Sequence, residues 1–216
     1  MSDFTSLLTI FGTSFLIALS GAMMPGPLLT ATISESSSRG AHAGPLMIAG
    51  HAILELLLVV SLLSGFAAFL QKPGVFVLTA LAGSGILIYM AAGMLSSLSS
   101  LTLAQQPGAA HRNHLLLSGI LMSLANPYWI MWWATIGMGY ILFSWKLGLA
   151  GVAVFFAGHI LADLAWYSLI SAAVAHGRQF LSDTIYRGFI AVLAVFLISF
   201  ALFFAFQGFS KISELI

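Results

Sequence analysis

A long apolar run that begins at Phe4 is interrupted by the stretch Ser20-Gly21-Ala22-Met23-Met24-Pro25-Gly26-Pro27. Each proline removes a backbone donor, its ring clashes with the preceding turn, and the residue before it is pushed out of the helical region. We therefore expect the first helix to break near residue 25. In lipid, the backbone groups freed by a break are tolerated only when they are buried in protein or line a polar cavity. The stretch predicts a place where something other than lipid is bound.

The composition is that of an integral membrane protein. Of the 216 residues, 60% are hydrophobic and only 6% are charged, whereas about 25% are charged in soluble domains. The formal net charge of +1 leaves no basic surface for nucleic acid. The chain has no cysteine, which excludes thiol redox chemistry, thiolate metal sites and disulfides. No cofactor is expected, and the expected partners are the lipid bilayer, protons and a small-molecule substrate.

Six stretches reach the length of about 20 apolar residues that a membrane-spanning helix needs. They are Phe4 to Met24, continued beyond the break by Leu28 to Ile33, then Gly44 to Leu70, Val75 to Leu98, His114 to Phe143, Leu147 to Ala175, and Gly188 to Phe206. The fourth stretch is interrupted at Asn126-Pro127. Polar loops are expected at 34–42 and 176–187, and a polar tail is expected from Gln207. We predict an all-α membrane protein.

The six predicted helices form two sets of three that resemble each other. In each set a helix broken at a proline is followed by a helix with a Gly-His pair and an acid four residues after the histidine. The landmarks are Pro25, Gly50, His51 and Glu55 in the first set, and Pro127, Gly158, His159 and Asp163 in the second. Three crossings separate equivalent helices, so the second set enters from the opposite face. This predicts a 3+3 inverted-topology repeat, which is common in secondary transporters. The repeats cover about 1–100 and 112–210 of a single domain, 1–216.

The histidines and acids suggest a proton pathway. His51 and Glu55 lie one helical turn apart and share a face, as do His159 and Asp163. An ionised side chain at the bilayer centre costs about 2.5–3.5 kcal/mol, so such residues usually mark pathways or proton relays. Histidine also titrates near neutral pH. We predict that these four residues couple transport to protons, although each pair could instead be a structural contact.

The two helix breaks suggest a substrate site. A helix that resumes after a break presents free N–H groups and a positive dipole end, which suit a carboxylate. The helix that ends before it leaves carbonyl groups that suit a cation or an ammonium group. An amino acid carries both charges. The predicted substrate-binding residues are Pro25, Gly26, Pro27, Asn126 and Pro127.

A cluster of aromatic residues follows the second break. Tyr128, Trp129, Trp132 and Trp133 could wall a substrate cavity, but we expect them to be packing residues or interface anchors. Ser123 is expected to make a hydrogen bond between helices.

These residues together resemble the lysine exporter (LysE/RhtB-type) translocators. The motifs that carry the resemblance are the Pro-Gly-Pro at 25–27, Asn126-Pro127, the Asp163-Leu-Ala-Trp-Tyr167 run and Arg187-Gly188. The resemblance covers essentially the whole chain. It implies a small multi-pass exporter of amino acids in the inner membrane, driven by proton antiport, dimeric, and not an enzyme.

The histidine–acid pairs keep a second function open. His51, Glu55 and His159 depart from the commonest pattern of the resembled family, and the wider superfamily includes cadmium and manganese exporters. Imidazole and carboxylate ligands suit zinc, manganese or similar ions. A divalent-metal exporter with His51, Glu55, His159 and Asp163 as ligands is therefore the alternative. A membrane-embedded hydrolase is disfavoured, because the chain has neither a His-Glu-x-x-His nor a Gly-x-Ser-x-Gly motif.

Overall fold

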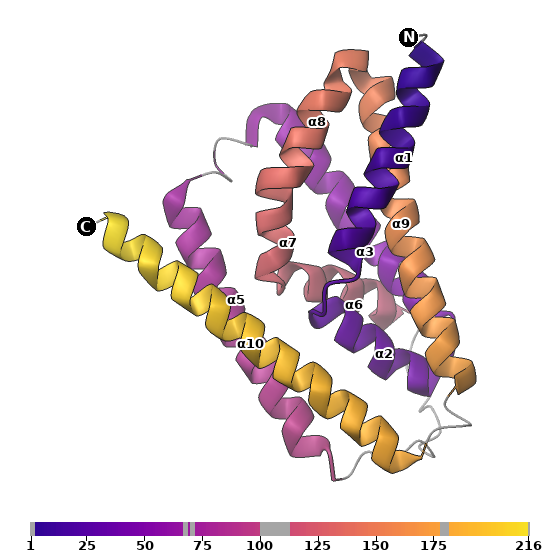
Figure 1. Ribbon diagram of the computed structural model, residues 1–216, viewed down its shortest axis with the longest axis vertical. Helices are drawn as coiled ribbons and strands as arrows, with labels where there is room; N and C mark the ends of the chain where they lie inside the picture. The colour runs from indigo at the N-terminus through magenta and orange to yellow at the C-terminus, as the bar shows by residue number, and fades with distance from the viewer. Residues whose placement is uncertain (1–2, 67–68, 70–71, 100–112, 178–181, 216) are drawn as a thin grey trace.

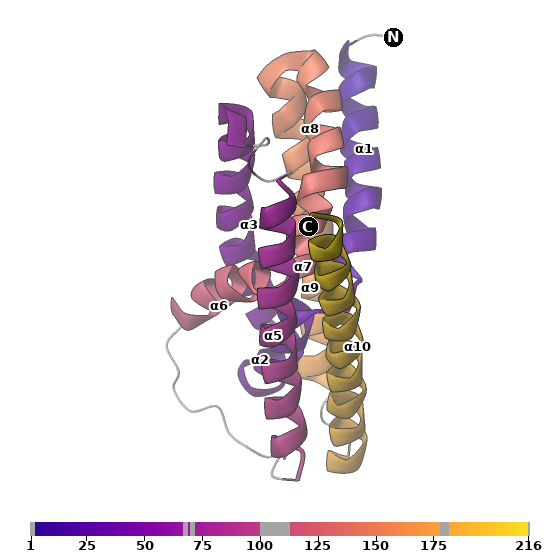
Figure 2. The same ribbon diagram turned by 90° about the vertical axis from the view of Figure 1, so that its left-hand side faces the viewer.

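The structure is a computed structural model that describes residues 3–66, 69, 72–99, 113–177 and 182–215. All the regular structure in these ranges is helical (Figures 1 and 2). Five apolar helical stretches among the described residues are long enough to cross a membrane. They are Phe4–Ala22, Ala43–Phe66, Pro73–Ser97, Pro127–Gly177 and Asp183–Ile212. The chain is thus an all-helical protein with several membrane-span-length helices.

The predicted break in the first helix is confirmed. Helix α1 (Asp3–Ala22) ends before the prolines, and α2 (Pro27–Arg39) begins with Pro27 at its first position. Proline is well suited to that position, because it has no N–H to leave unpaired and its fixed φ is helical. Gly26 between them is extended, with φ −154° and ψ −176°. The two helices therefore change direction at the break (Figure 1).

The predicted loop at 34–42 was wrong over most of its length. Its serines lie within α2, and their hydroxyl groups donate to carbonyls of the preceding turn; Ser36 Oγ, for example, lies 2.6 Å from Thr32 O. Glu35 and Arg39 add an ion pair at 2.6 Å on the same helix, at the i,i+4 spacing that supports helices. Only the short turn after Arg39 is non-helical.

The second break occurs at Asn126, between α6 (Asn113–Leu124) and α7 (Pro127–Trp132). The Asn126 Oδ1 atom accepts a hydrogen bond from the Tyr128 N–H at 3.1 Å, so the residue caps the new helix. The helical path then continues through η2 (Trp133–Gly137), α8 (Met138–Ser144) and η3 (Trp145–Leu147).

The chain folds back at Gly148, which begins α9 (Gly148–Gly177) with φ +64°. Glycine adopts this left-handed region without the steric cost that other residues meet. The whole stretch Pro127–Gly177 has 51 residues and would be about 75 Å long if straight. Instead, α8 and α9 run side by side (Figure 1).

The remaining helices are α3, α5 and α10. Helix α3 (Ala43–Ser61) continues as η1 (Leu62–Phe66), and α5 (Pro73–Ser97) packs along α10 (Asp183–Leu215) at one side of the molecule (Figures 1 and 2).

Helix α10 is longer than the predicted Gly188 to Phe206, so two expectations were wrong. The predicted loop at 176–187 ends by residue 182, and the expected polar tail from Gln207 is helical to Leu215. At the start of the helix, Ser182 Oγ accepts from the Ile185 N–H at 3.3 Å, and Asp183 places an acid in the first turn. Both features stabilise a helix N-terminus.

Two glycines bring the central helices into close contact. A Cβ atom added to Gly50 of α3 would collide with the carbonyl of Leu116 in α6. A Cβ atom added to Gly158 of α9 would collide with Ser14 Oγ and lie 2.7 Å from the Phe11 carbonyl oxygen, both in α1. Small residues at such positions allow helix backbones to approach each other. Each glycine directly precedes one of the histidines of the predicted site.

Candidate functional site

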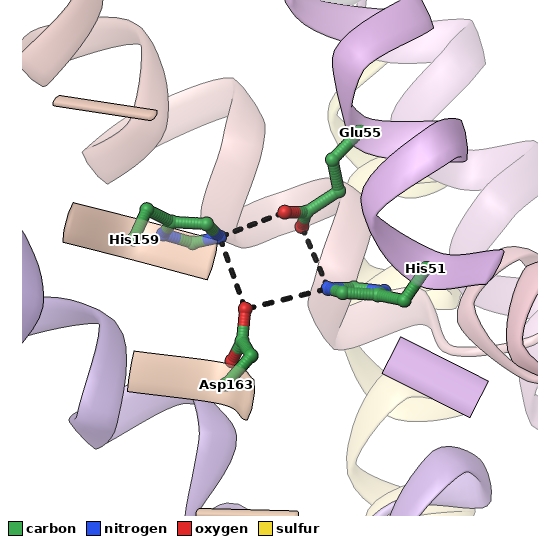
Figure 3. Close-up of side chains that lie close together, drawn as sticks. All are labelled: His51, Glu55, His159 and Asp163. Atoms are coloured by element: carbon green, nitrogen blue, oxygen red, sulfur yellow. Dashed lines mark ion pairs between the residues drawn. The ribbon is translucent and has the colours of Figure 1, made fainter. Parts of the chain in front are cut away.

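Four ionisable side chains meet between α3 and α9 (Figure 3). His51 and Glu55 come from α3, and His159 and Asp163 come from α9. The i,i+4 spacing places each pair on one face of its helix, and the two faces point at each other. All four residues are buried, with exposed fractions of 1 to 5%. The sequence suggested the two pairs, and the structure joins them into one group, which we call the quartet.

The quartet is closed by four contacts between imidazole nitrogens and carboxylate oxygens (Figure 3). His51 Nε2 lies 3.0 Å from Glu55 Oε1 and 3.6 Å from Asp163 Oδ2. His159 Nε2 lies 2.9 Å from Glu55 Oε2 and 3.4 Å from Asp163 Oδ2. The four possible ligand atoms all lie within 4.8 Å of one another. Each histidine thus contacts the acid of its own helix and the acid of the other.

Two tryptophans hold Glu55 in place. The Nε1–H groups of Trp129 and Trp133 both donate to Glu55 Oε1, at 2.8 and 2.7 Å. Both residues pack in the hydrophobic core as expected, but the expectation did not include their hydrogen bonds to Glu55. A buried indole N–H normally needs an acceptor, and a buried carboxylate in the neighbouring helix supplies one. The sequence contains both the tryptophans and the acid, but which indole meets which carboxylate depends on how the helices pack.

Ser123 orients the ring of His51. Its Oγ atom lies 2.7 Å from His51 Nδ1 and donates to the Gly119 carbonyl at 2.7 Å. This is the interhelical hydrogen bond that the sequence predicted for Ser123. Its consequence for the site is that the ring of His51 is fixed with Nε2 toward the carboxylates.

Aromatic rings enclose His159. The ring of Trp132 lies 4.8 Å from the imidazole, Trp133 lies 5.3 Å away and Phe155 lies 6.0 Å away, measured between centroids. Trp133 and Phe155 are fully buried. These contacts make one side of the quartet apolar.

A cavity of about 50 Å³ connects the quartet with the two helix breaks. Gly26 of the first break and Asn126 of the second both line it. A Cβ atom on Gly26 would lie 3.2 Å from Asn126 Nδ2, so the two breaks face each other. The rest of its wall includes all four quartet residues, Ser123, Tyr128, Trp129, Trp132 and Tyr167.

Pro27 and Pro127 are not on the wall of the quartet cavity, although their neighbours Gly26 and Asn126 are. Pro27 and Pro127 are buried at the first positions of α2 and α7. Pro127 lines a separate, mostly apolar cavity of about 110 Å³ between α5 and α7. Among the predicted substrate residues, Gly26 and Asn126 are thus the two on the wall of the quartet cavity, and the prolines create the breaks that expose them.

The site can bind charged ligands, because it combines two carboxylates, two imidazoles and unused donors. The indole Nε1 of Trp132 is buried, lines the cavity and has no hydrogen-bond partner among the described residues. A cation fits between the quartet atoms, and an acceptor group fits against the Trp132 N–H.

Comparison with known proteins places the chain among membrane transporters. Over 95% of its length, the chain is 23% identical to a protein of Bacillus subtilis (strain 168) named "Putative amino acid efflux protein YcgF", of which the alignment covers 99%. No solved structure matches the chain. Residues 19–208, which include both helix breaks and the quartet, match the family described as LysE type translocators. The chain therefore belongs to the LysE type translocator family, a family of membrane transporters and not of enzymes.

Proposed function

We propose that this protein exports amino acids or similar small zwitterions across the cell membrane. The observation that carries the proposal is the cavity between the two helix breaks, with the quartet on its wall. The name of the Bacillus subtilis relative supports the substrate class. The cavity offers groups for both charges of a zwitterion.

The ammonium group of the substrate would bind at Asp163. Its Oδ2 atom is buried, lines the same cavity and has no hydrogen-bond partner among the described residues. Glu55 is less suited to this role, because its Oε1 already accepts from two indoles. A buried carboxylate oxygen without a donor is costly, and an ammonium group supplies the donor.

The carboxylate group of the substrate would bind at the start of α2. This 13-residue helix begins at a glycine that provides no side-chain cap, so its first N–H groups and its positive dipole end suit an anion. The unpartnered Trp132 N–H lies on the same cavity wall. The ammonium group of an amino acid would thus bind to α9, and its carboxylate group would bind to α2.

The arrangement of helices supports the predicted six crossings and the inverted repeat. Helix α1 packs on α9 in the same way that α6 packs on α3, and each contact depends on the glycine before a quartet histidine. The pairs α3–α9 and α5–α10 join equivalent helices of the two halves. The stretch Pro127–Gly177 would cross the membrane twice, because the chain turns at Gly148.

Transport requires the two halves to move apart. A cavity of about 50 Å³ holds only a few water molecules, at about 10–15 Å³ each, and is too small for an amino acid. The substrate would enter when one repeat moves against the other, as in alternating access. We propose that His51, Glu55, His159 and Asp163 couple this movement to protons.

The test is efflux from proteoliposomes that contain the purified protein and a mixture of amino acids, with and without an imposed pH gradient. The wild type should release at least one amino acid faster than empty liposomes do. Asp163→Asn should reduce that rate at least tenfold, because it removes the charge that binds the ammonium group. The matched control is Glu35→Gln, which neutralises a carboxylate of α2 that pairs with Arg39 outside the cavity.

The outcomes separate the parts of the proposal. A wild type that releases no amino acid contradicts the export function. Full activity of Asp163→Asn contradicts the substrate site. Export that does not respond to the pH gradient contradicts proton coupling alone.

A further inference from the structure

We infer that the quartet is a binding site for one divalent metal ion of the zinc class, held by His51 Nε2, His159 Nε2 and one oxygen each of Glu55 and Asp163. The inference does not rest on amino-acid export, because ion binding can be measured on the protein without any amino acid. Both ligands would use Asp163, so the metal ion and the substrate ammonium group would bind there in alternation.

The hydrogen-bond network of His51 is the first argument. The hydroxyl group of Ser123 has a single hydrogen, which it donates to the Gly119 carbonyl. The contact between Ser123 Oγ and His51 Nδ1 therefore needs the hydrogen on Nδ1. A neutral His51 then turns the lone pair of Nε2 toward Glu55 Oε1 and Asp163 Oδ2. Three acceptors that face one another need either a second proton, on Nε2, or a metal ion between them.

The second argument comes from His159. Its Nε2 atom, Glu55 Oε2 and Asp163 Oδ2 are all buried, and none of them has a hydrogen-bond partner among the described residues. Yet the nitrogen lies 2.9 and 3.4 Å from the two oxygens. Atoms at these distances that do not point along hydrogen bonds are arranged like ligands around a common centre.

The distances agree with the size of a tetrahedral site. Zinc binds imidazole nitrogen and carboxylate oxygen at about 2.0–2.2 Å, so neighbouring ligand atoms are about 3.3 Å apart. The nitrogen–oxygen distances in the quartet, which involve both oxygens of Glu55, run from 2.9 to 3.6 Å, and four ligand atoms, one from each residue, lie within 4.8 Å of one another. Side chains of the same four residues can thus surround one ion with small adjustments.

The surroundings of the ligands also fit a metal site. Ligating histidines usually donate the other ring N–H to a second group, and ligating carboxylates accept further hydrogen bonds. Ser123 satisfies the first condition at His51, and the indoles of Trp129 and Trp133 satisfy the second at Glu55. A divalent ion would neutralise the two carboxylates, which meet no Lys or Arg among the ion pairs of the described residues.

The ligand set selects the ion. Two imidazoles favour zinc and its transition-metal neighbours over Mg²⁺ and Ca²⁺, which prefer oxygen ligands. Four ligands in a buried site suit the four-coordinate geometry of structural zinc.

The experiment measures Zn²⁺ binding to the full chain, purified in detergent without a histidine tag and stripped with a chelator. Equilibrium dialysis in a buffer that contains excess Mg²⁺, followed by metal analysis, should find about one Zn²⁺ per chain. Cobalt provides a second measurement: Co²⁺ in this site should show the intense visible bands of four-coordinate cobalt, which Zn²⁺ abolishes.

The variants test the assignment of ligands. His159→Gln and Asp163→Asn should each weaken Zn²⁺ binding at least tenfold and remove the cobalt bands. Ser123→Ala should weaken binding about 10–100-fold, as expected for a group that orients a ligand. His176→Gln is the matched control, because it removes an exposed histidine of α9 outside the quartet.

Two results would overturn the inference. The first is a wild type that binds no stoichiometric Zn²⁺ and shows no cobalt bands, which would leave the quartet as a ring of imidazolium and carboxylate ion pairs. The second is Zn²⁺ binding by folded Asp163→Asn equal to that of the wild type. Neither result bears on amino-acid efflux in the proteoliposomes.

Discussion

Gly50 and Gly158 are the residues that bring the quartet together. Each lies where the backbone of another helix crosses, α6 at Gly50 and α1 at Gly158, so no side chain fits between the helices. Each is followed directly by a quartet histidine. The position of the imidazoles therefore depends on how closely these helices approach.

We predict that Gly50→Ala destabilises the protein by about 1–3 kcal/mol, because the new methyl group collides with the Leu116 carbonyl. A loss of this size should lower the Tm in detergent by several degrees, since about 2–4 °C corresponds to 1 kcal/mol in a chain of this length. Gly93→Ala is the control, because a Cβ atom there meets nothing within 4 Å. Its Tm should stay level or rise slightly. An equal decrease in both variants would contradict the packing argument.

At the scale of elements, the two broken helices determine the shape of the site. Each resumes at a proline, after Gly26 in one case and Asn126 in the other. Glycine offers no side-chain cap, whereas asparagine caps α7 through its Oδ1. The two breaks thus differ in chemistry, and the helix start without a side-chain cap is that of α2.

Asn126→Ala should cost about 1 kcal/mol of stability, because it removes the acceptor of the Tyr128 N–H. Asn126→Ser should recover most of the loss, since serine is also a good N-cap. Thermal unfolding of the three proteins in the same detergent measures both effects. If Asn126→Ser is as unstable as Asn126→Ala, the residue acts through another contact.

The sequence predicts the helices better than it predicts their ends. Apolar length and the prolines located the helices and both breaks, because these depend on local backbone chemistry. The ends of α2 and α10 were missed, since polar residues there bond within their own helix, as Ser36 does with Thr32. Local patterns favour a loop for such residues.

For the site too, the sequence predicts local features but not the contacts between helices. The i,i+4 spacing identified both histidine–acid pairs, but their meeting depends on the contact between α3 and α9. The role of Trp129 and Trp133 was missed for the same reason, because their acceptor is in another helix.

On the scale of the whole molecule, the helix order predicts which segments share a side of the membrane. The N-terminal end of α1 and the turn between α8 and α9, which holds Lys146, lie at the top of Figure 1, and the ends of α2 and α9 lie lower down. The segment before α5, which holds Lys72, is expected on the same side of the membrane as the first two. This follows if the chain crosses six times in two inverted halves.

Single cysteines can test this arrangement, since the natural chain has none. Lys72→Cys and Lys146→Cys should react with a membrane-impermeant maleimide from one side. His42→Cys and His176→Cys, both at exposed positions, should react only from the other side. Labelling of right-side-out and inverted vesicles measures the difference. Reaction of the two lysine positions from opposite sides would contradict the inverted repeat.

The indoles around the quartet give the protein a built-in optical reporter. Three of the five tryptophans, Trp129, Trp132 and Trp133, lie at the site. Indole emission responds to nearby charge and to hydrogen bonding at Nε1, and two of these groups donate directly to Glu55. Replacing Trp145 and Trp166 with phenylalanine would leave a fluorescence signal that comes only from the binding centre. Occupancy could then be followed in real time by spectroscopy, without any attached dye.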